Sequence, residues 1–339
     1  MMKDQDIHIE AQLLFLKQVG DLIPSGNSLV AELADLLEVS TDSAYRRLRG
    51  ETPLSFGEIM KLCRTFQLSF DAITGISSDS VTFRYQPNGN TRENFIKYLD
   101  GIRNNLEILS KSKNSKIIYA AEDIPVFHHF QFPLLTSFKL FYWMKSVMNL
   151  EEYSSTKFSA NVPGSEVTGI CRQLNELYYS IPSVEIWTEL TVNSILKQIQ
   201  FYWESDLFED RTIALAVCED LIHEMESVRI QAEKSTKHTN EKELALNNGN
   251  FLLFLSEVEI GNNNILAMVN ELKTLYISHF TYNLISTNSK IFCGETEKWL
   301  DNLTRKSVQI SGISEKQRYR FFSDVNKTIE SLHKKIRLE

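Results

Sequence analysis

One stretch of the sequence, residues 27–68, constrains the fold most, because it predicts three short helices separated by tight turns. In the first helix, about residues 29–37, Leu33, Ala34 and Leu37 recur on one face of a structure with 3.6 residues per turn. This apolar face predicts that the helix packs against its two neighbours along the chain.

The second helix of this stretch has residues suited to both of its ends. Residues 40–42, Ser-Thr-Asp, are types that cap helix N-termini, and Gly50 tolerates the positive φ that is common after a helix C-terminus. Between these ends, Ala44 and Leu48 point inward at helical spacing. The pattern predicts a helix over about residues 41–49.

A third helix begins near Leu54 or Ser55. Ser55 and Glu58 have the spacing of a capping box, in which each side chain bonds the backbone N–H of the other residue. The apolar residues that close the small core from this helix are Ile59, Leu62, Cys63 and Phe66. Residues 5–23 predict a further helix on the same core, with its apolar side formed by Ile7, Leu13, Leu14, Leu16 and Val19.

The outward side of the second helix indicates a function. With Ala44 and Leu48 inside, Tyr45, Arg46 and Arg49 are left outside. Helix-turn-helix proteins place the N-terminal residues of this helix against base edges in the major groove, and arginine bonds guanine or phosphate. Residues 41–50 hold three arginines and one aspartate, whereas the whole chain carries a net charge of −8, so the basic surface is local.

At these residues the sequence LADLLEVSTDSAYRRLRGE, residues 33–51, resembles the Cro/C1-type (XRE-like) helix-turn-helix family. The resemblance covers roughly residues 25–70 and implies that Ala34 lets two helices approach and that Val39 is buried in the turn. Glu38 stands at a turn position where Gly or Asn is common. By the resemblance the recognition segment runs from residue 40 to 49, and its DNA-contacting residues are Ser40, Thr41, Asp42, Ser43, Tyr45, Arg46, Arg47 and Arg49.

Composition places the whole chain among cytoplasmic globular proteins. A hydrophobic content of 42% and a charged content of 24% are ordinary for such proteins, and only 13 Gly and 7 Pro favour long helices over a loop-rich β architecture. No window approaches the length of a membrane span, and the polar first ten residues are unlike a signal peptide. The four cysteines are far apart and are expected to be reduced, buried thiols.

We expect a mainly α protein with a helix-turn-helix domain at residues 1–76 and an effector and dimerisation region at residues 77–339. The boundary falls in the polar segment 75–80, and a further division near residue 240 would separate a helical part from an α+β part. Apolar spacing predicts helices at about 91–112, from Pro133 onward, and at about 165–180, 184–206, 210–234, 295–306 and 314–337.

Strand patterns are fewer. Residues 116–123 form the clearest strand candidate, and residues 81–87 fit a strand or an extended linker. Short apolar runs separated by Gly-Asn and Thr-Asn-Ser turns predict a small antiparallel sheet near residues 250–290. Residues 232–243 are charged and are expected to form a solvated helix end or loop.

No motif indicates catalysis. His128 and His129 are adjacent and would diverge, and the His223-Glu224 pair lacks the second histidine of a metalloprotease helix. No phosphate-binding glycine loop or nucleophile elbow occurs. We therefore expect no enzyme activity, no catalytic residue, no cofactor and no metal site.

The leading interpretation is a bacterial transcription regulator that binds double-stranded DNA as a homodimer. An effector, either a small molecule or a protein, would act on the C-terminal region. An aromatic cluster there either lines a cavity for a small apolar or aromatic ligand or fills a helical core; its members are Phe127, Phe130, Phe132, Phe138, Phe141, Tyr142 and Trp143. The alternative function is a protein-interaction scaffold whose N-terminal helices bind a partner protein. The operator, the sign of regulation and the effector are not encoded in any recognisable pattern.

Overall fold

The computed structural model describes residues 4–23, 28–66, 68, 81–87, 89, 91–237 and 249–339. The chain forms two compact units, Met1–Phe83 and Arg84–Glu339. The boundaries expected near residues 76 and 240 lie outside the described residues.

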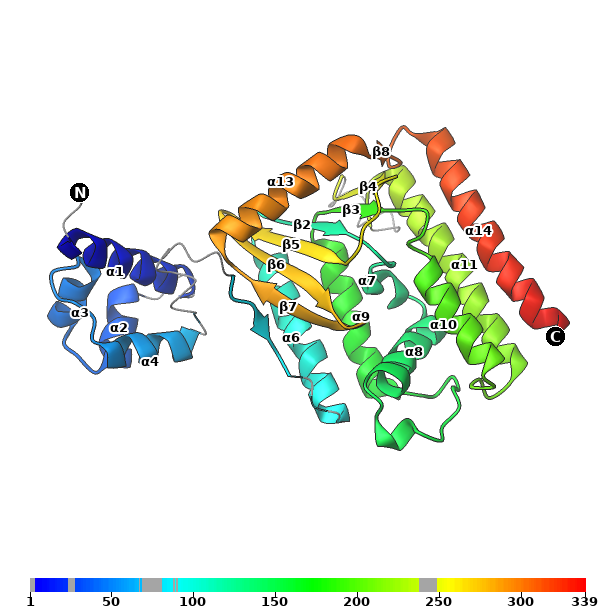
Figure 1. Ribbon diagram of the computed structural model, residues 1–339, viewed down its shortest axis with the longest axis horizontal. Coiled ribbons are helices and arrows are strands. Elements are labelled where there is room, and N and C mark those ends of the chain that lie inside the picture. Colours follow the sequence, from blue (N-terminus) through cyan, green and yellow to red (C-terminus); the bar gives the residue numbers. More distant parts are fainter. Residues whose placement is uncertain are drawn as a thin grey trace. The chain divides into compact units, whose positions relative to one another are not determined.

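In its described residues the N-terminal unit has four helices around one small core (Figure 1). The helices are α1 (Asp4–Asp21), α2 (Leu29–Leu37), α3 (Thr41–Leu48) and α4 (Phe56–Phe66). The three helices expected between residues 27 and 68 are therefore confirmed. The buried residues of the core are Phe15, Leu16, Val19, Leu33, Ala34, Leu37, Ala44, Leu62 and Leu68.

The expected apolar face of α1 is partly wrong. Leu16 and Val19 are buried, but Leu13 and Leu14 are exposed and Phe15 takes their place in the core. Four consecutive apolar residues, 13–16, leave the helical phase ambiguous, and the longer side chain of Phe15 reaches the interior.

The C-terminal unit contains one mixed sheet of eight strands in the order β1-β7-β6-β5-β2-β3-β4-β8. The strands are β1 (Arg84–Tyr85), β2 (Ser115–Ala120), β3 (Ser183–Trp187), β4 (Phe251–Leu255), β5 (Asn264–Val269), β6 (Leu272–His279), β7 (Asn283–Thr287) and β8 (Val308–Gln309). The strands β2, β3 and β4 are parallel, and β5 pairs antiparallel with β2, so that Ile118 lies between Val184 and Leu266.

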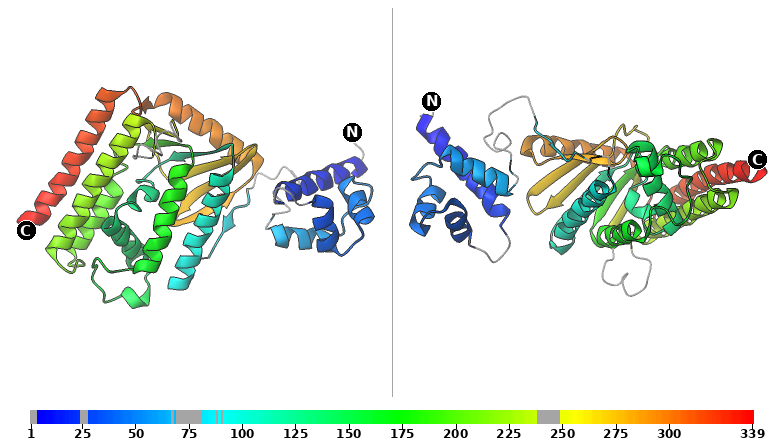
Figure 2. Two further views of the ribbon diagram at one scale, coloured as in Figure 1. Left: turned by 180° about the vertical axis from the view of Figure 1, so that it is seen from behind. Right: turned by 90° about the horizontal axis from the view of Figure 1, so that it is seen from below.

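Helices cover both faces of the sheet (Figures 1 and 2). Because side chains alternate along a strand, Ile117 and Tyr119 of β2 face one layer, and Ile118 and Ala120 face the other. The larger layer comprises α6 (Arg92–Lys111), α7 (Val126–His129), α8 (Pro133–Tyr142), α9 (Ser165–Ser180), α10 (Asn193–Glu204), α11 (Arg211–Lys234) and α14 (Glu315–Leu338), and the helix on the other face is α13 (Lys290–Lys306).

The mainly α architecture with a sheet is confirmed, and β5, β6 and β7 are the antiparallel strands expected near residues 250–290. The expected helix over 184–206 is wrong at its start, because residues 183–187 form β3 and α10 begins only at Asn193. Every residue of β3 is buried. A strand that is covered on both faces lacks the polar alternation that distinguishes strands from helices.

Two further features affect the larger unit. Residues Trp143–Val147 continue α8 as a π-helix, and Glu151–Tyr153 form a 3₁₀ turn. Lys237, expected in a solvated segment, is fully buried and donates hydrogen bonds to the carbonyl oxygens of Tyr178 and Ile181. No helix of the described residues combines the length and the apolar character needed to cross a membrane.

Candidate nucleic-acid interface

The turn between α2 and α3 contains Glu38, at the position where Gly or Asn is common. Glu38 has a φ of 58°, in the left-handed region that favours Gly and Asn. The N–H of Val39 donates to the carbonyl oxygen of Ala34 at 3.0 Å, and the carboxylate of Glu38 lies 2.6 Å from Lys61 Nζ. The turn is therefore closed by backbone bonding of α2, and the exposed ion pair to α4 adds little to its stability.

One small residue lets the helix α3 pack closely against its neighbours. Ala44 is fully buried, so α3 approaches α2 closely. The Ser40 hydroxyl oxygen accepts a hydrogen bond from the Ser43 N–H at 3.2 Å and caps the helix start. Thr41, the first residue of α3, is exposed. The cap and the small residue together leave the N-terminal turn of α3 at the surface.

The outward side of α3 carries most of the residues expected to contact DNA. Tyr45 is 53% exposed, and the side chains of Arg46 and Arg49 are 58% and 57% exposed. Arg46 Nε lies 3.1 Å from Asp42 Oδ2, and Arg49 Nε lies 3.2 Å from Glu51 Oε1. Exposed ion pairs contribute little to stability, so a phosphate or a base edge can replace either acid.

Arg47, the neighbouring arginine, is held differently. Its side chain is only 14% exposed, and Nη2 lies 2.8 Å from Glu58 Oε1 on α4. Its Nη1 also donates to the hydroxyl and the carbonyl oxygen of Ser43, at 2.6 and 3.1 Å. The guanidinium of Arg47 therefore ties α3 to α4, whereas those of Arg46 and Arg49 lie at the surface.

The carboxylate of Glu58 takes part both in a capping box with Ser55 and in the contact with Arg47. It accepts a hydrogen bond from the Ser55 N–H at 2.7 Å, and the Ser55 hydroxyl accepts from the Glu58 N–H at 3.3 Å, so the predicted capping box is confirmed. Burial opposes ionisation of Glu58, but the Ser55 N–H and the Arg47 guanidinium outweigh it and hold its pKa below the ordinary value. Glu58 thus stays charged and fixes the start of α4 against α3.

Sequence reasoning missed the contribution of Gln12 from α1. Its Nε2 donates to the carbonyl oxygens of Arg47 and Thr52 at 2.8 and 2.9 Å, and its Oε1 accepts from the Leu54 N–H at 2.8 Å. These bonds fix the loop that follows α3. A single glutamine in an amphipathic helix carries no local pattern that would reveal partners about forty residues away.

Gly50 is required at the end of α3 for two reasons. Its φ of +73° confirms the expected left-handed conformation. A Cβ atom there would also lie 2.8 Å from Ile9 Cγ2 of α1. The close approach of α1 thus adds a packing requirement to the conformational one.

In the larger unit, the adjacent histidines diverge as expected. His128 Nε2 lies 3.0 Å from Glu185 Oε1, and His129 Nδ1 lies 2.8 Å from Glu224 Oε2, all of them buried. Within the parts of the chain that the structure describes, no group of three His, Cys, Asp or Glu residues could hold a metal ion. These pairs bind α7 to β3 and to α11.

The aromatic cluster divides between a core and a cavity. Phe138 and Phe141 are fully buried among other rings, so they fill the helical core. Phe127, Phe130 and Trp143 line a cavity of about 50 Å³. An engineered cavity that binds benzene measures about 150 Å³. The cavity is therefore too small for an aromatic ligand, which was one of the two alternatives that the sequence allowed.

Comparison with known proteins concerns the N-terminal part. Residues 11–91 match the BetR domain family, a small helical DNA-binding-like regulator domain. No curated protein and no solved structure matches the chain. The matched region includes most of α1, in agreement with the contacts of Gln12, and it covers about a quarter of the 339 residues.

Proposed function

We propose that this protein is a transcription regulator of the Cro/C1 (XRE-like) type, which binds duplex DNA in the bacterial cytoplasm. The helix α3 enters the major groove. Its N-terminal residues Thr41 and Asp42 face the base edges, and Tyr45, Arg46 and Arg49 contact bases or phosphates. Arg47 lies outside this contact set because Glu58 holds it.

One observation carries the proposal. Arg46 on α3 and Arg49 at its C-cap are exposed, each forms an ion pair with an acid at the surface, and the Arg49 guanidinium also lies 5.9 Å from the centre of the exposed Tyr45 ring. Such guanidinium groups can exchange a carboxylate for a phosphate oxygen with little loss. The match of residues 11–91 to a DNA-binding-like domain supports the same conclusion.

We further propose that the protein binds as a homodimer, with its two α3 helices about 34 Å apart on successive turns of the duplex. Residues 84–339 supply the dimer contact and respond to an effector. A change in the separation of the two recognition helices then alters occupancy of the operator.

The decisive experiment is selection of bound duplexes from a random pool by the full chain. An enriched palindrome supports both DNA binding and the dimer. An enriched sequence without symmetry supports DNA binding by one copy. Failure to enrich any sequence at low salt contradicts the proposal.

The double variant Arg46→Ala/Arg49→Ala tests the contact set on the selected duplex. Affinity should fall at least about tenfold, since a good arginine contact to a base contributes about 1–3 kcal/mol. The slope of log affinity against log salt should flatten by about 0.9 for each arginine that neutralises a phosphate.

The matched control is Lys111→Ala/Lys113→Ala, which removes the same charge from exposed positions of the larger unit. Its affinity and salt slope should match those of the unaltered protein. Equal losses in both double variants would indicate general attraction by net charge. Binding of a partner protein that hardly responds to salt, without any DNA binding, would favour the scaffold function instead.

A further inference from the structure

A cavity and an open cleft meet at one edge of the sheet in the larger unit. The cavity measures about 50 Å³ and the cleft about 630 Å³, and both are lined by Asp123, Asn263, Ser278 and Thr281. Asp123 follows the carboxyl end of β2, and Asn263 precedes β5, which pairs with β2. Crevices at the carboxyl ends of parallel strands are the usual ligand sites of such sheets.

The wall between cavity and cleft is a fixed polar network. Asn263 Nδ2 donates to Asp123 Oδ1 at 2.6 Å, and Asn263 Oδ1 accepts from the Glu122 N–H at 2.9 Å. The Ser278 hydroxyl oxygen accepts from the Asn263 N–H at 3.1 Å. The contacts of Asn263 with Glu122 and Asp123 join segments about 140 residues apart, and the network holds the opening in shape.

A buried cation lies at this opening. Lys139 of α8 is 1% exposed, and its Nζ lies 3.6 Å from Asp123 Oδ2 and 3.2 Å from Gln198 Oε1. Within the described part of the chain these are its polar partners, and an ammonium group has three N–H donors. The long distance to Asp123 leaves the ammonium able to bond another acceptor.

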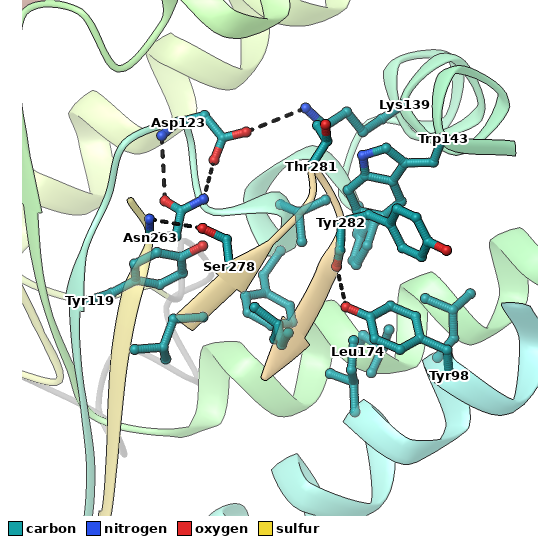
Figure 3. A pocket seen from close by; sticks show the side chains of 17 residues that line it. Tyr98, Tyr119, Asp123, Lys139, Trp143, Leu174, Asn263, Ser278, Thr281 and Tyr282 are labelled. Atoms are coloured by element: carbon teal, nitrogen blue, oxygen red, sulfur yellow. Dashed lines mark hydrogen bonds and ion pairs between the residues drawn. The ribbon is translucent and has the colours of Figure 1, made fainter. Parts of the chain in front are cut away.

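A second donor, the indole of Trp143, lies beside it, with its ring centre 5.8 Å from Lys139 Nζ. The indole Nε1 of Trp143 is buried, and among the described residues no acceptor lies within hydrogen-bonding distance of it. Figure 3 shows this nitrogen on the same side of the cavity as the Lys139 ammonium. Trp143 opens the π-helical turn Trp143–Val147, an irregularity that is frequent at functional sites. Buried donors without acceptors are rare in proteins, so the site lacks an acceptor.

We propose that this cavity binds a small aliphatic carboxylic acid, whose carboxylate accepts hydrogen bonds from Lys139 Nζ and Trp143 Nε1. Its short tail occupies the inner part, which is lined by apolar side chains such as Leu99, Phe127 and Leu174. A space of about 50 Å³ holds only a few carbon atoms, and a longer or aromatic tail does not fit.

The α-carbon of such an acid lies at the opening, where the cleft presents Glu122 and Asp123. An α-ammonium group there would meet two carboxylates. Amino acids and unsubstituted acids thus share the carboxylate chemistry of the site, and binding measurements distinguish them. The site lies within the larger unit and does not depend on the DNA contacts proposed for α3.

The test is calorimetric titration of the full chain, without DNA, by propanoate, alanine and the neutral isostere propan-1-ol. At least one of the two carboxylates should bind saturably at one site, and the alcohol should not. Binding by alanine alone assigns the ligand to amino acids, and binding by both assigns it to aliphatic carboxylates in general. Binding by neither at millimolar concentration, or equal binding by the alcohol, overturns the proposal.

Variants of the two donors test whether the carboxylate binds in this cavity. Trp143→Phe keeps the ring and removes the donor, and it should weaken binding about tenfold or more, because hydrogen bonds to charged acceptors are strong. Lys139→Met should abolish binding. If Lys139→Met does not fold, Trp143→Phe alone decides. The control is Trp299→Phe, at an exposed position of α13, which should bind as the unaltered protein does. Unchanged affinity in Trp143→Phe overturns the proposal.

Discussion

The two units hold their charged side chains in opposite ways. On α3, Arg46 and Arg49 pair with acids at the solvent-exposed surface. In the larger unit, Glu185 is fully buried and accepts hydrogen bonds from three side chains. Charged side chains that exchange an intramolecular partner for a ligand lie at the surface, where water and ligands compete with that partner. Charged side chains that hold elements of the fold together have their partners in the interior.

The same contrast exists within α3 itself. Arg46 and Arg47 are adjacent, yet the first is exposed and the second bonds Glu58 and Ser43. Net charge alone does not distinguish them. Their different surroundings predict different effects on stability and on DNA binding.

The largest expected effect lies in the buried network of the larger unit. Glu185 accepts from Tyr178 Oη at 2.7 Å, from Trp187 Nε1 at 2.9 Å and from His128 Nε2 at 3.0 Å. The variant Glu185→Ala leaves these donors buried without an acceptor. We expect the free energy of unfolding of this unit to fall by about 3–5 kcal/mol. Urea unfolding followed by near-ultraviolet circular dichroism measures it.

The control for this variant is Glu189→Ala, at an exposed position just beyond β3. It should change the free energy of unfolding by less than roughly 0.5 kcal/mol. A loss in Glu185→Ala as small as that of the control would show that the buried network does not stabilise the fold.

A smaller effect separates the two adjacent arginines. Arg47→Met should lower the free energy of unfolding of the N-terminal unit by about 1.5–3 kcal/mol, because its hydrogen bonds to the charged Glu58 are lost. Arg46→Met should change it by less than roughly 0.5 kcal/mol. For DNA binding the larger effect is expected from the other variant. If Arg46 contacts a phosphate, Arg46→Met reduces the slope of log affinity against log salt by about 0.9, whereas folded Arg47→Met keeps the slope of the unaltered protein.

The contact between Arg47 and Glu58 also predicts a pH dependence. The pKa of Glu58 is lower in the folded unit than in the unfolded chain, so the unfolded state binds the proton more readily. The stabilisation is therefore complete above the ordinary glutamate pKa and is lost as the pH falls through the lowered value. Glu58→Gln should remove this part of the acid sensitivity. An unchanged acid transition in Glu58→Gln would contradict the assignment.

Local patterns could predict much of the N-terminal unit. Gly50, the Ser40 cap and the capping box of Ser55 and Glu58 depend on residues close in the chain, so the sequence alone indicates them. The partners of Gln12 lie 35 to 42 residues away, and no local pattern links them.

In the larger unit, less of the structure could be predicted from local sequence patterns. The strand β3 lacks an alternating pattern because both of its faces are buried, so it was expected to be helical. The contact of Asp123 with Asn263 spans 140 residues and follows from the pairing of β2 with β5. No sequence pattern links Asp123 with Asn263, since strand order is a property of the whole sheet.

The smallest expected effect concerns the acid that accompanies Arg49. Glu51→Gln removes an exposed carboxylate and should change the free energy of unfolding by less than roughly 0.5 kcal/mol. If Arg49 contacts a phosphate, loss of this competing negative charge should raise DNA affinity about two- to fivefold at low salt, and less at high salt because exposed charges are screened. Fluorescence anisotropy on a selected duplex measures the DNA affinity at low salt and at high salt. Glu295→Gln, at an exposed position of α13, makes the same charge change and should leave affinity unaltered. A lower affinity in Glu51→Gln would instead mean that Glu51 holds Arg49 in the orientation that binds, and the exposed pairs of α3 would then resemble the buried pairs of the larger unit in fixing geometry.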